Sequence, residues 1–346
     1  MIEQRGFNLK LSIKQIVRFI VIIVIFSLLS FYKLPYYIYT PGKALDLKQV
    51  VQVSDGNESK GSLHLLTVSG QTATPLLYAL AQFKPYDDIV PIEEARPHGI
   101  SDEEYLKSQL NLMENSQEAS TVVAYEAANA DIDITYNGVY VLGVIKDMPA
   151  DDILQVGDLI TKIDNKDVFE AEDLTAYIQE KKNLNAVDLT FKRNDKVYNK
   201  KIKLTQFPDK DKKGIGIQLV TNRDVNVDPD VEFSSGNIGG PSAGMMLALS
   251  IYDQLEEEDL TKGLKIAGSG QLDYDGNVLP IGGIDKKVIA ADKKDIDILF
   301  APSMETHEQS NYEEAKEMAE EIDSDMKIIP VETFQDALDY LKTVAE

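Results

Sequence analysis

The sequence predicts an α+β protein with a transmembrane helix at its N-terminus. Its 346 residues correspond to about two domains at roughly 150 residues each. An apolar run occupies residues 13–32, and the rest of the chain mixes strand-like alternation with helix-like periodicity. The hydrophobic content of 43% and the charged content of 27% are those of an ordinary folded protein, which excludes a wholly disordered chain.

The first expected element is a membrane helix at residues 13–32. The segment carries no charge from Phe19 onward, and its length roughly spans a hydrocarbon core of about 30 Å. Basic residues lie before it and in its first turns, namely Arg5, Lys10, Lys14 and Arg18. This asymmetry predicts a single-pass protein of the cell membrane, with a cytoplasmic N-terminus and the remaining chain outside. A cleaved signal peptide is the alternative, although no small-residue cleavage site follows the run.

Composition excludes several classes of function. The formal net charge of −23 opposes binding to nucleic acid phosphates. The absence of cysteine excludes disulfides, thiolate zinc sites, iron–sulfur clusters and cysteine nucleophiles. His64, His98 and His307 are far apart and form no HExxH pair, so no metal site is expected. No GxxxxGK[ST] motif occurs, and we therefore expect neither ATP nor another cofactor.

A strand and two helices are expected after the membrane helix. The strand covers residues 61–69, and a short helix at residues 74–82 has Pro75 at its start, where proline is favoured. A longer helix at residues 101–130 opens with Ser101 and Glu104 at the spacing of a capping box. This longer helix carries the chain toward the next domain.

Residues 120–206 form a strand-rich block. Strand-like runs occupy residues 139–145, 158–163 and 187–191, and a helix is expected at residues 171–181. Asn137-Gly138 is interpreted as a turn between two strands. The element content predicts a small domain built mainly from strands.

The segment GVYVLGVIKDMPADDILQVGDLITKIDNKDV, residues 138–168, resembles the bacterial PDZ pattern. The resemblance implies that an extended peptide adds as a strand to an exposed sheet edge beside a helix. It puts the family's carboxylate-binding loop at Gly138, Val139 and Tyr140. Tyr140 replaces a glycine of many family members, so internal peptide segments are expected rather than a free C-terminus. The alternative is a spacer domain that binds nothing.

A glycine-rich turn delivers Ser242 to the start of an apolar helix that ends near Leu255. A serine at this point lies beside unpaired backbone N–H groups and the positive end of the helix dipole, which can stabilise an oxyanion. Gly240 and Pro241 in the approach to the serine leave room for a substrate backbone. The alternative readings are a helix cap and a phosphate-binding turn.

A second glycine turn precedes a helix that carries Lys286 and Lys287. At 100° per residue, Lys287 borders the apolar stripe of this helix, whereas Lys286 faces away from it. Burial disfavours the ammonium form, so Lys287 is the lysine whose pKa is expected to fall into the range of a general base. A surface lysine is the alternative.

Together the two motifs resemble the proteolytic domain of the Lon family, which has a G-P-S-A-G serine and a G-G-x-x-x-K lysine. The resemblance implies a catalytic dyad of Ser242 and Lys287, supported by Ser269, Gly240 and Pro241. Ser269 stands where a family hydroxyl orients the lysine, and Gln271 departs from the family's glutamate. The implied fold is mixed α/β, of the type of the second domain of ribosomal protein S5.

The whole chain resembles the membrane-anchored, PDZ-bearing Lon-like proteases of Gram-positive bacteria. This predicts an anchor at residues 1–35, a protease domain divided between residues 36–119 and 207–346, and an inserted PDZ-like domain at residues 120–206. The implied activity is ATP-independent serine endopeptidase cleavage of extracellular peptides or unfolded protein segments, including secreted signalling peptides of the quorum-sensing kind. The rivals are a noncatalytic cell-surface adaptor that binds peptides through the PDZ-like domain, and a Ser-His hydrolase.

Overall fold

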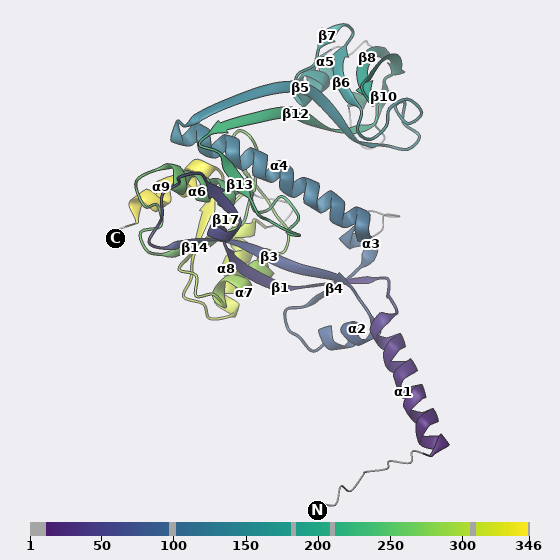
Figure 1. Ribbon diagram of the computed structural model, residues 1–346, viewed down its shortest axis with the longest axis vertical. Helices are drawn as coiled ribbons and strands as arrows, with labels where there is room; N and C mark the ends of the chain where they lie inside the picture. The colour runs from purple at the N-terminus through teal and green to yellow at the C-terminus, as the bar shows by residue number, and fades with distance from the viewer. Residues whose placement is uncertain (1–11, 97–101, 181–184, 208–211, 305–308, 345–346) are drawn as a thin grey trace, which may run out of the picture. The chain divides into compact units, whose positions relative to one another are not determined.

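The computed structural model describes residues 12–96, 102–180, 185–207, 212–304 and 309–344 (Figure 1). The chain divides into two compact units, and the second unit, Asp131–Asp228, is inserted in the sequence of the first, Met1–Ala130 and Pro229–Glu346. The inserted unit begins at Asp131 rather than at 120 because helix α4 (Asp102–Ala128) continues past that point. It ends at Asp228 rather than at 206 because strand β12 (Ile217–Asp228) belongs to its sheet.

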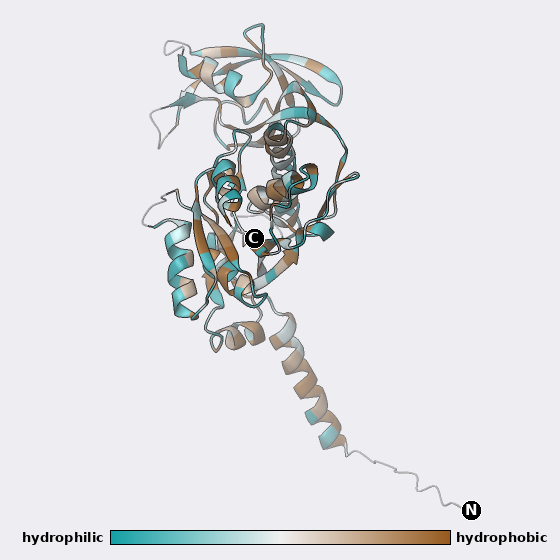
Figure 2. Cartoon of the chain, turned by 90° about the vertical axis from the view of Figure 1, so that its left-hand side faces the viewer, coloured by the Kyte–Doolittle hydropathy of each residue, from teal (hydrophilic) through white to brown (hydrophobic). Residues whose placement is uncertain are grey.

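Helix α1 (Ile13–Phe31) coincides with the expected membrane segment. Ser12 and Gln15 form a capping box at its start, and none of its residues is buried. It is apolar along most of its length (Figure 2), and its most apolar window has a mean hydropathy of 2.2. Among the described residues it is the one helix long and apolar enough to cross a membrane, a property that signal sequences share.

A six-stranded mixed sheet forms the centre of the first unit, in the order β18-β17-β14-β3-β1-β4. The strands are β1 (Tyr36–Asp46), β3 (Ser62–Thr72), β4 (Asp88–Pro91), β14 (Lys265–Gly268), β17 (Ile298–Pro302) and β18 (Lys327–Val331). Strands β3, β14, β17 and β18 run parallel, whereas β1 is antiparallel to β3 and β4. Strand β14 pairs with β3 only over Ser62–Leu65, so β3 continues beyond its neighbour.

Helices cover both faces of this sheet. On one face, α7 and α8 bury Ile284, Val288 and Ala315 against Leu299 of β17. The neighbouring Phe300 points to the other face because side chains alternate along a strand, and there its ring contacts Tyr340 of α9. The helices are α2 (Pro75–Ala81), α3 (Ile92–Ala95), α6 (Gly244–Leu255), α7 (Ile284–Asp292), α8 (Asn311–Glu321) and α9 (Phe334–Thr343), with a short 3₁₀ helix at Leu47–Gln49.

Local sequence signals explain several boundaries in the first unit. Thr74 caps α2 and Pro75 occupies its first turn, as expected. Helix α4 matches the expected helix at 101–130, although Ser101 and its proposed cap lie outside the described residues. Two small strand pairs complete the unit: β2 (Val51–Val53) with β13 (Val231–Phe233), and β15 (Gln271–Leu272) with β16 (Val278–Leu279).

The second unit is a sheet with the order β12-β5-β6-β8-β9 and one helix, α5 (Ala171–Glu180). Its strands are β5 (Asp131–Val144), β6 (Leu159–Ile163), β7 (Lys166–Asp167), β8 (Ala186–Arg193), β9 (Lys196–Lys203) and β12, with a further pair, β10 (Thr205–Gln206) and β11 (Lys213–Gly214). Val139, Ile160, Leu189 and Leu174 meet in its core. The alternating burial of β8 confirms the pattern expected at 187–191.

The expected turn at Asn137-Gly138 is wrong. Strand β5 continues through both residues and pairs with β12 along its length. The register shifts there, because Gly138 lies opposite Asn222 while Tyr136 lies opposite Arg223. One extra residue therefore sits in β5 as a β-bulge, and Gly138 takes a φ of 119° that favours glycine.

Candidate active site

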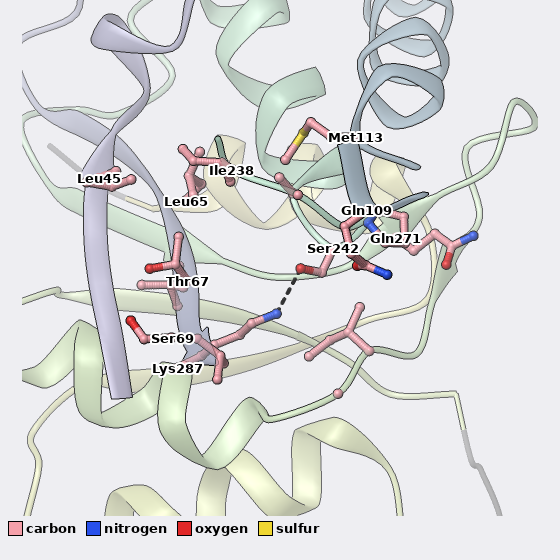
Figure 3. Close-up of a pocket in the computed structure, with 18 of the residues that line it drawn as sticks. Leu45, Leu65, Thr67, Ser69, Gln109, Met113, Ile238, Ser242, Gln271 and Lys287 are labelled. Atoms are coloured by element: carbon pink, nitrogen blue, oxygen red, sulfur yellow. Dashed lines mark hydrogen bonds between the residues drawn. The ribbon is translucent and has the colours of Figure 1, made fainter. Parts of the chain in front are cut away.

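Ser242 lies in the turn before α6, at the end of the sheet where β14 stops (Figure 3). Its carbonyl oxygen accepts hydrogen bonds from the N–H of Gly270 and the Oγ of Ser269, each 3.0 Å away. The carbonyl of Pro241 accepts from Ser116 of α4 at 3.0 Å. Gly240 has a φ of 90°, which favours glycine. The chain on both sides of the serine is thus held by two other segments of the first unit.

The N–H groups near Ser242 are only partly free. The N–H of Gly240 donates to the carbonyl of Gln109 at 2.8 Å, and Pro241 has no N–H to offer. In the part of the chain that the structure describes, the amides of Ser242 and Ala243 have no acceptor. The backbone N–H groups of Ser242 and Ala243, which precede α6, are therefore open to an acceptor, whereas the N–H of Gly240 is already occupied.

Lys287 projects from the first turn of α7 toward Ser242 (Figure 3). Its Nζ lies 2.9 Å from the Oγ of Ser242 and 2.8 Å from the Oγ of Ser269. Gly283 begins the helix with a φ of 66°, a conformation that favours glycine. The structure thus brings together Ser242, Lys287 and Ser269, which are far apart in the sequence.

Burial sets the electrostatics of Lys287. Only 3% of the residue is exposed. Burial lowers the pKa of Lys287 from 10.5 to about 7, since removal from water disfavours the ammonium ion. No carboxylate of the described residues forms a salt bridge with Lys287 to reverse this effect. Near pH 7, Lys287 is therefore neutral in a large fraction of the molecules, and a neutral amine can accept a proton.

The hydroxyl of Ser269 sets the direction of the lysine hydrogen bonds. Its O–H donates to the carbonyl of Ser242, so its oxygen is free to accept an N–H of Lys287. A neutral amine that donates in this direction can turn its lone pair to the Oγ–H of Ser242. Ser269 is fully buried, which fixes this arrangement. The contact places Ser269 beside the amine that it is expected to orient.

Helical periodicity predicted only that Lys286 faces away from the apolar stripe of α7, and it did not predict the burial of this lysine. It is 2% exposed, because Asp88 of β4 and Asp285 cover its ammonium group. Its Nζ donates to Asp88 and, at 2.7 Å, to the Oδ2 of Asp285. Burial alone lowers the pKa of Lys286, but the two carboxylates outweigh it and leave the pKa above its ordinary value. Lys286 thus stays charged.

Ser242 and Lys287 line an open cleft of about 620 Å³. Strand β3 forms one wall with Leu65, Thr67 and Val68, and the two glycine turns and α4 contribute to the other walls. Gln271, which departs from the family's glutamate, also lines this cleft. The size of the cleft is within the usual range of ligand pockets.

The expected peptide-binding residues do not form a loop. Gly138, Val139 and Tyr140 lie inside β5, where Val139 and Tyr140 pair with both β12 and β6. The N–H of Gly138 donates to the carbonyl of Phe169 at 3.2 Å. Flanked on both sides, this stretch offers little free backbone to a peptide carboxylate.

A groove of about 250 Å³ lies instead between α5 and β12 of the second unit. Strand β12 is at the end of the sheet, so one of its edges has no neighbour among the described strands. Leu174 and Ile178 of α5 and Ile217 of β12 line the groove. At its end, the amides of Ile215 and Gly216 have no acceptor among the described residues. Sequence reasoning missed this site, although the alternation Gly-Ile-Gly-Ile at 214–217 marks it.

The three histidines and possible metal ligands are also candidates for functional residues. His64 lies buried in β3 and does not line the cleft, while His98 and His307 lie outside the described residues. Within the described ranges, no group of three His, Asp or Glu side chains is placed to hold a metal ion.

Comparisons with known proteins assign both units. A family model of the Lon protease (S16) C-terminal proteolytic domain matches residues 209–343, and a model of the PDZ domain matches residues 126–204. The Lon protease of Campylobacter jejuni is 37% identical over 102 residues, which cover 29% of this chain and 12% of that protein. The Lon protease of aster yellows witches'-broom phytoplasma is 34% identical over 97 residues, covering 28% and 11%. The chain therefore matches only a small part of the length of these relatives.

A solved structure is similar to part of this chain. The PDZ domain of an SdrC-like protein from Listeria monocytogenes is 43% identical, and the match covers 25% of this chain and 93% of that one with a TM-score of 0.24. By the two family matches, this chain carries a Lon-type (S16) C-terminal proteolytic domain together with a PDZ domain.

Proposed function

We propose that this chain is a serine endopeptidase in which Ser242 is the nucleophile and Lys287 is the general base. The observation that carries the proposal is the 2.9 Å contact between Lys287 Nζ and Ser242 Oγ, made by a buried lysine whose pKa is about 7. A lysine of this kind can remove the serine proton near neutral pH. The Lon-type proteolytic domain supports the same reaction class.

In the proposed reaction, neutral Lys287 takes the proton of Ser242 as Oγ bonds to the peptide carbonyl carbon. The N–H groups of Ser242 and Ala243 stabilise the negative oxygen. The C–N bond then breaks, and the ammonium of Lys287 gives its proton to the leaving amine. Water attacks the resulting ester with Lys287 again as base, which releases the acid product and restores the serine.

The substrate is proposed to bind as an extended strand along the free edge of β3. The carbonyl of Tyr36 accepts a hydrogen bond from the N–H of Ala73. Because hydrogen-bonded pairs alternate with non-hydrogen-bonded pairs in an antiparallel ladder, every second residue of β1 from Tyr36 onward forms hydrogen bonds with β3. Pro41, which has no N–H, lies opposite Val68 and fits the non-bonded positions. By this alternation Val68 and Gly70 direct their N–H and C=O groups away from β1, toward the edge that β14 leaves open beyond Leu65. An edge of this kind suits unfolded segments and flexible peptides.

We further propose that α1 anchors the enzyme in the cell membrane, with both units outside the cell, and that cleavage needs no ATP. The basic residues before α1 support the orientation, and the length and hydropathy of α1 support the span. The lack of a phosphate-loop motif in this sequence supports independence from ATP. Secreted signalling peptides are the proposed physiological substrates, because they are short and need no unfolding.

The groove between α5 and β12 is proposed to recruit peptides by strand addition. The unpaired amides of Ile215 and Gly216 would hold a terminal carboxylate, with Lys212 and Lys213 beside them. A free C-terminus is therefore proposed in place of the internal segments that the sequence suggested.

The test is mass spectrometry of a mixed peptide library incubated with the full chain in detergent micelles, without ATP and with EDTA. Cleavage by the parent should disappear in Ser242→Ala and Lys287→Ala. Ser234→Ala, which changes an exposed serine outside the cleft, is the matched control and should cleave like the parent. Cleavage that survives in Ser242→Ala would show that another group is the nucleophile. Silence of the parent on every peptide would favour the noncatalytic adaptor.

Replacement of Ser269 by alanine should lower kcat by about 10- to 100-fold, because Lys287 loses the acceptor that orients its lone pair. KM should change little, since Ser269 is buried beneath the cleft. Ser269→Thr keeps the hydroxyl and should restore most of the rate. An equal loss of kcat in Ser269→Ala and Ser269→Thr would mean that the site tolerates no change of packing at this position. It would contradict the proposal that Ser269 orients Lys287.

A further inference from the structure

A second pocket of about 520 Å³ lies next to the catalytic cleft in the first unit. Both cavities are lined by Val68, Gln109 and Gly239, so the two are immediate neighbours. The second pocket has an aromatic and apolar wall, formed by Tyr37 and Tyr39 of β1 and by Tyr105 and Leu106 of α4. We call it the tyrosine pocket.

The three tyrosine rings form one cluster. The ring centroids of Tyr37 and Tyr39 are 5.1 Å apart, and those of Tyr37 and Tyr105 are 6.5 Å apart, both in edge-to-face geometry. Burial, followed by the neighbouring Tyr105, raises the pKa of Tyr39 to about 12. The phenol of Tyr39 is therefore neutral at any physiological pH. Leu106 remains 44% exposed and adds apolar surface that no neighbouring side chain covers fully.

Gly70, on the free edge of β3, leaves room for the ring of Tyr37. A Cβ atom at this position would lie 2.5 Å from Cε1 of Tyr37, so the ring of Tyr37 lies directly over the glycine backbone. Val68, Gly70 and Thr72 share one face of the strand, the face on which their cross-strand neighbours Tyr39 and Tyr37 lie. A peptide that pairs with this edge would direct every second side chain toward the same face.

The charges at the pocket rim are already paired. Asp102 forms salt bridges with Lys33 and Arg96. These two cations hold the pKa of Asp102 below its ordinary value, so the carboxylate is ionised and compensated. A basic substrate side chain would have to displace one of them, whereas an aromatic or long aliphatic side chain needs only the ring cluster and Leu106.

We propose that the tyrosine pocket is a specificity subsite that receives an aromatic or long aliphatic side chain of the extended substrate, at a fixed position near the scissile bond. The proposal rests on the proposed peptidase function. Because the pocket is lined by Gly70 and adjoins the cleft of Ser242, it would hold the side chain of one residue of the peptide while the serine attacks another residue. Tyr105 and Leu106 come from α4 and supply the wall opposite β1.

The test measures binding and cleavage separately, with the full chain in detergent micelles. Fluorescein-labelled decapeptide mixtures, each with one position fixed as Phe, Leu, Lys or Gly, are titrated onto the Ser242→Ala chain. At one position Phe and Leu should bind about tenfold more tightly than Gly, as expected for an apolar side chain that enters a matching pocket. Tyr105→Ala in the same background should abolish this preference and leave the affinity of the Gly mixture unchanged.

Two further variants separate a subsite from a general structural effect. Tyr86→Ala removes a half-buried tyrosine of the first unit that does not line the pocket, and should keep the preference. Tyr105→Phe keeps the aromatic ring and should also keep the preference for Phe and Leu. Equal affinity for Phe and Gly at every position, or a preference for Lys, would overturn the subsite. If the parent cleaves no peptide but the Phe preference persists and depends on Tyr105, the peptidase proposal fails, and the tyrosine pocket is a side-chain pocket for bound peptides only.

Discussion

Helix α7 buries two lysine side chains, one beside carboxylates and the other beside serine hydroxyls. Lys286 and Lys287 are adjacent, and both are at least 97% removed from solvent, with 2% and 3% exposed. The ammonium group of Lys286 meets the carboxylates of Asp285 and Asp88, which raise its pKa. Lys287 meets only serine hydroxyls, and burial lowers its pKa to about 7. The partner, and not the burial, decides which lysine can act as a base.

The largest expected effect is on catalysis. Lys287→Met should lower kcat by at least about 10³-fold, because it removes the amine that contacts the Oγ of Ser242 among the described residues. Lys286→Met should lower kcat by less than about tenfold, since this lysine touches no reacting atom. Single-turnover rates on one cleavable peptide at pH 8 give both values. Lys293→Met, at the exposed end of α7, is the control. Equal losses at 286 and 287 would contradict the division of roles.

The pH dependence should come from Lys287 alone. Only the neutral amine is active, so kcat/KM should fall about tenfold for each pH unit below about 7 and level off above it. Lys286→Met should leave this midpoint in place, because the pKa of Lys287 is set by its own burial. The rate profile of a fixed peptide between pH 5 and 9 tests both statements. A midpoint that moves by a full unit in Lys286→Met would show that the two lysines titrate together.

The same two substitutions should change stability in opposite directions. The folded pKa of Lys287 is below its unfolded value of 10.5, so between about pH 7 and 10.5 the unfolded chain binds more protons and stability rises with pH. Lys287→Met removes this penalty and should stabilise the chain, on the order of a few kcal/mol at pH 6 and progressively less toward pH 10. Lys286 has a raised pKa, so its contribution is complete below its unfolded value and is lost only as the pH passes its folded pKa.

Lys286→Met should therefore destabilise the chain at every pH below 10. The loss is expected to be about 1 kcal/mol, because Asp88 is 58% exposed and regains water when its partner is removed. Urea unfolding at pH 6 and pH 9, followed by circular dichroism, gives the sign for each variant. A destabilised Lys287→Met at pH 6 would mean that the lysine is held by a charge partner after all.

Local patterns singled out Ser242 and Lys287, the two residues that the structure brings into contact, because each follows its own glycine turn. The glycine turn before Ser242 and the one before Lys287 are short-range signals, and the structure has a helix beginning at each. The burial of Lys286 could not be read in the same way. Asp88, which forms a salt bridge with Lys286, belongs to β4 and lies nearly two hundred residues earlier in the chain. Helical periodicity carries no information about such a distant neighbour.

In the inserted unit, too, a local sequence signal could not reveal a long-range contact. Asn137-Gly138 is a strong turn signal, but β12 offers a continuous partner to the whole of β5 and turns the signal into a bulge. The pairing of two long strands that are separated by the rest of the unit is a long-range event. The free edge of β12, and with it the groove beside α5, depends on that pairing, so local sequence patterns could not reveal the groove.

The smallest expected effect belongs to Asp88, and it tests how Lys286 is held. Asp88→Asn removes one of two carboxylates from Lys286, while Asp285 remains at 2.7 Å. Because Asp88 is 58% exposed and Asp285 only 26%, the exposed partner contributes less. Asp88→Asn should therefore cost less than about 1 kcal/mol of stability and leave the pH midpoint of cleavage unchanged, whereas Asp285→Asn should cost more. If Asp88→Asn instead proved the more harmful variant, the contact between β4 and α7 would be the main support of the catalytic helix, and the adjacent carboxylate only its accessory.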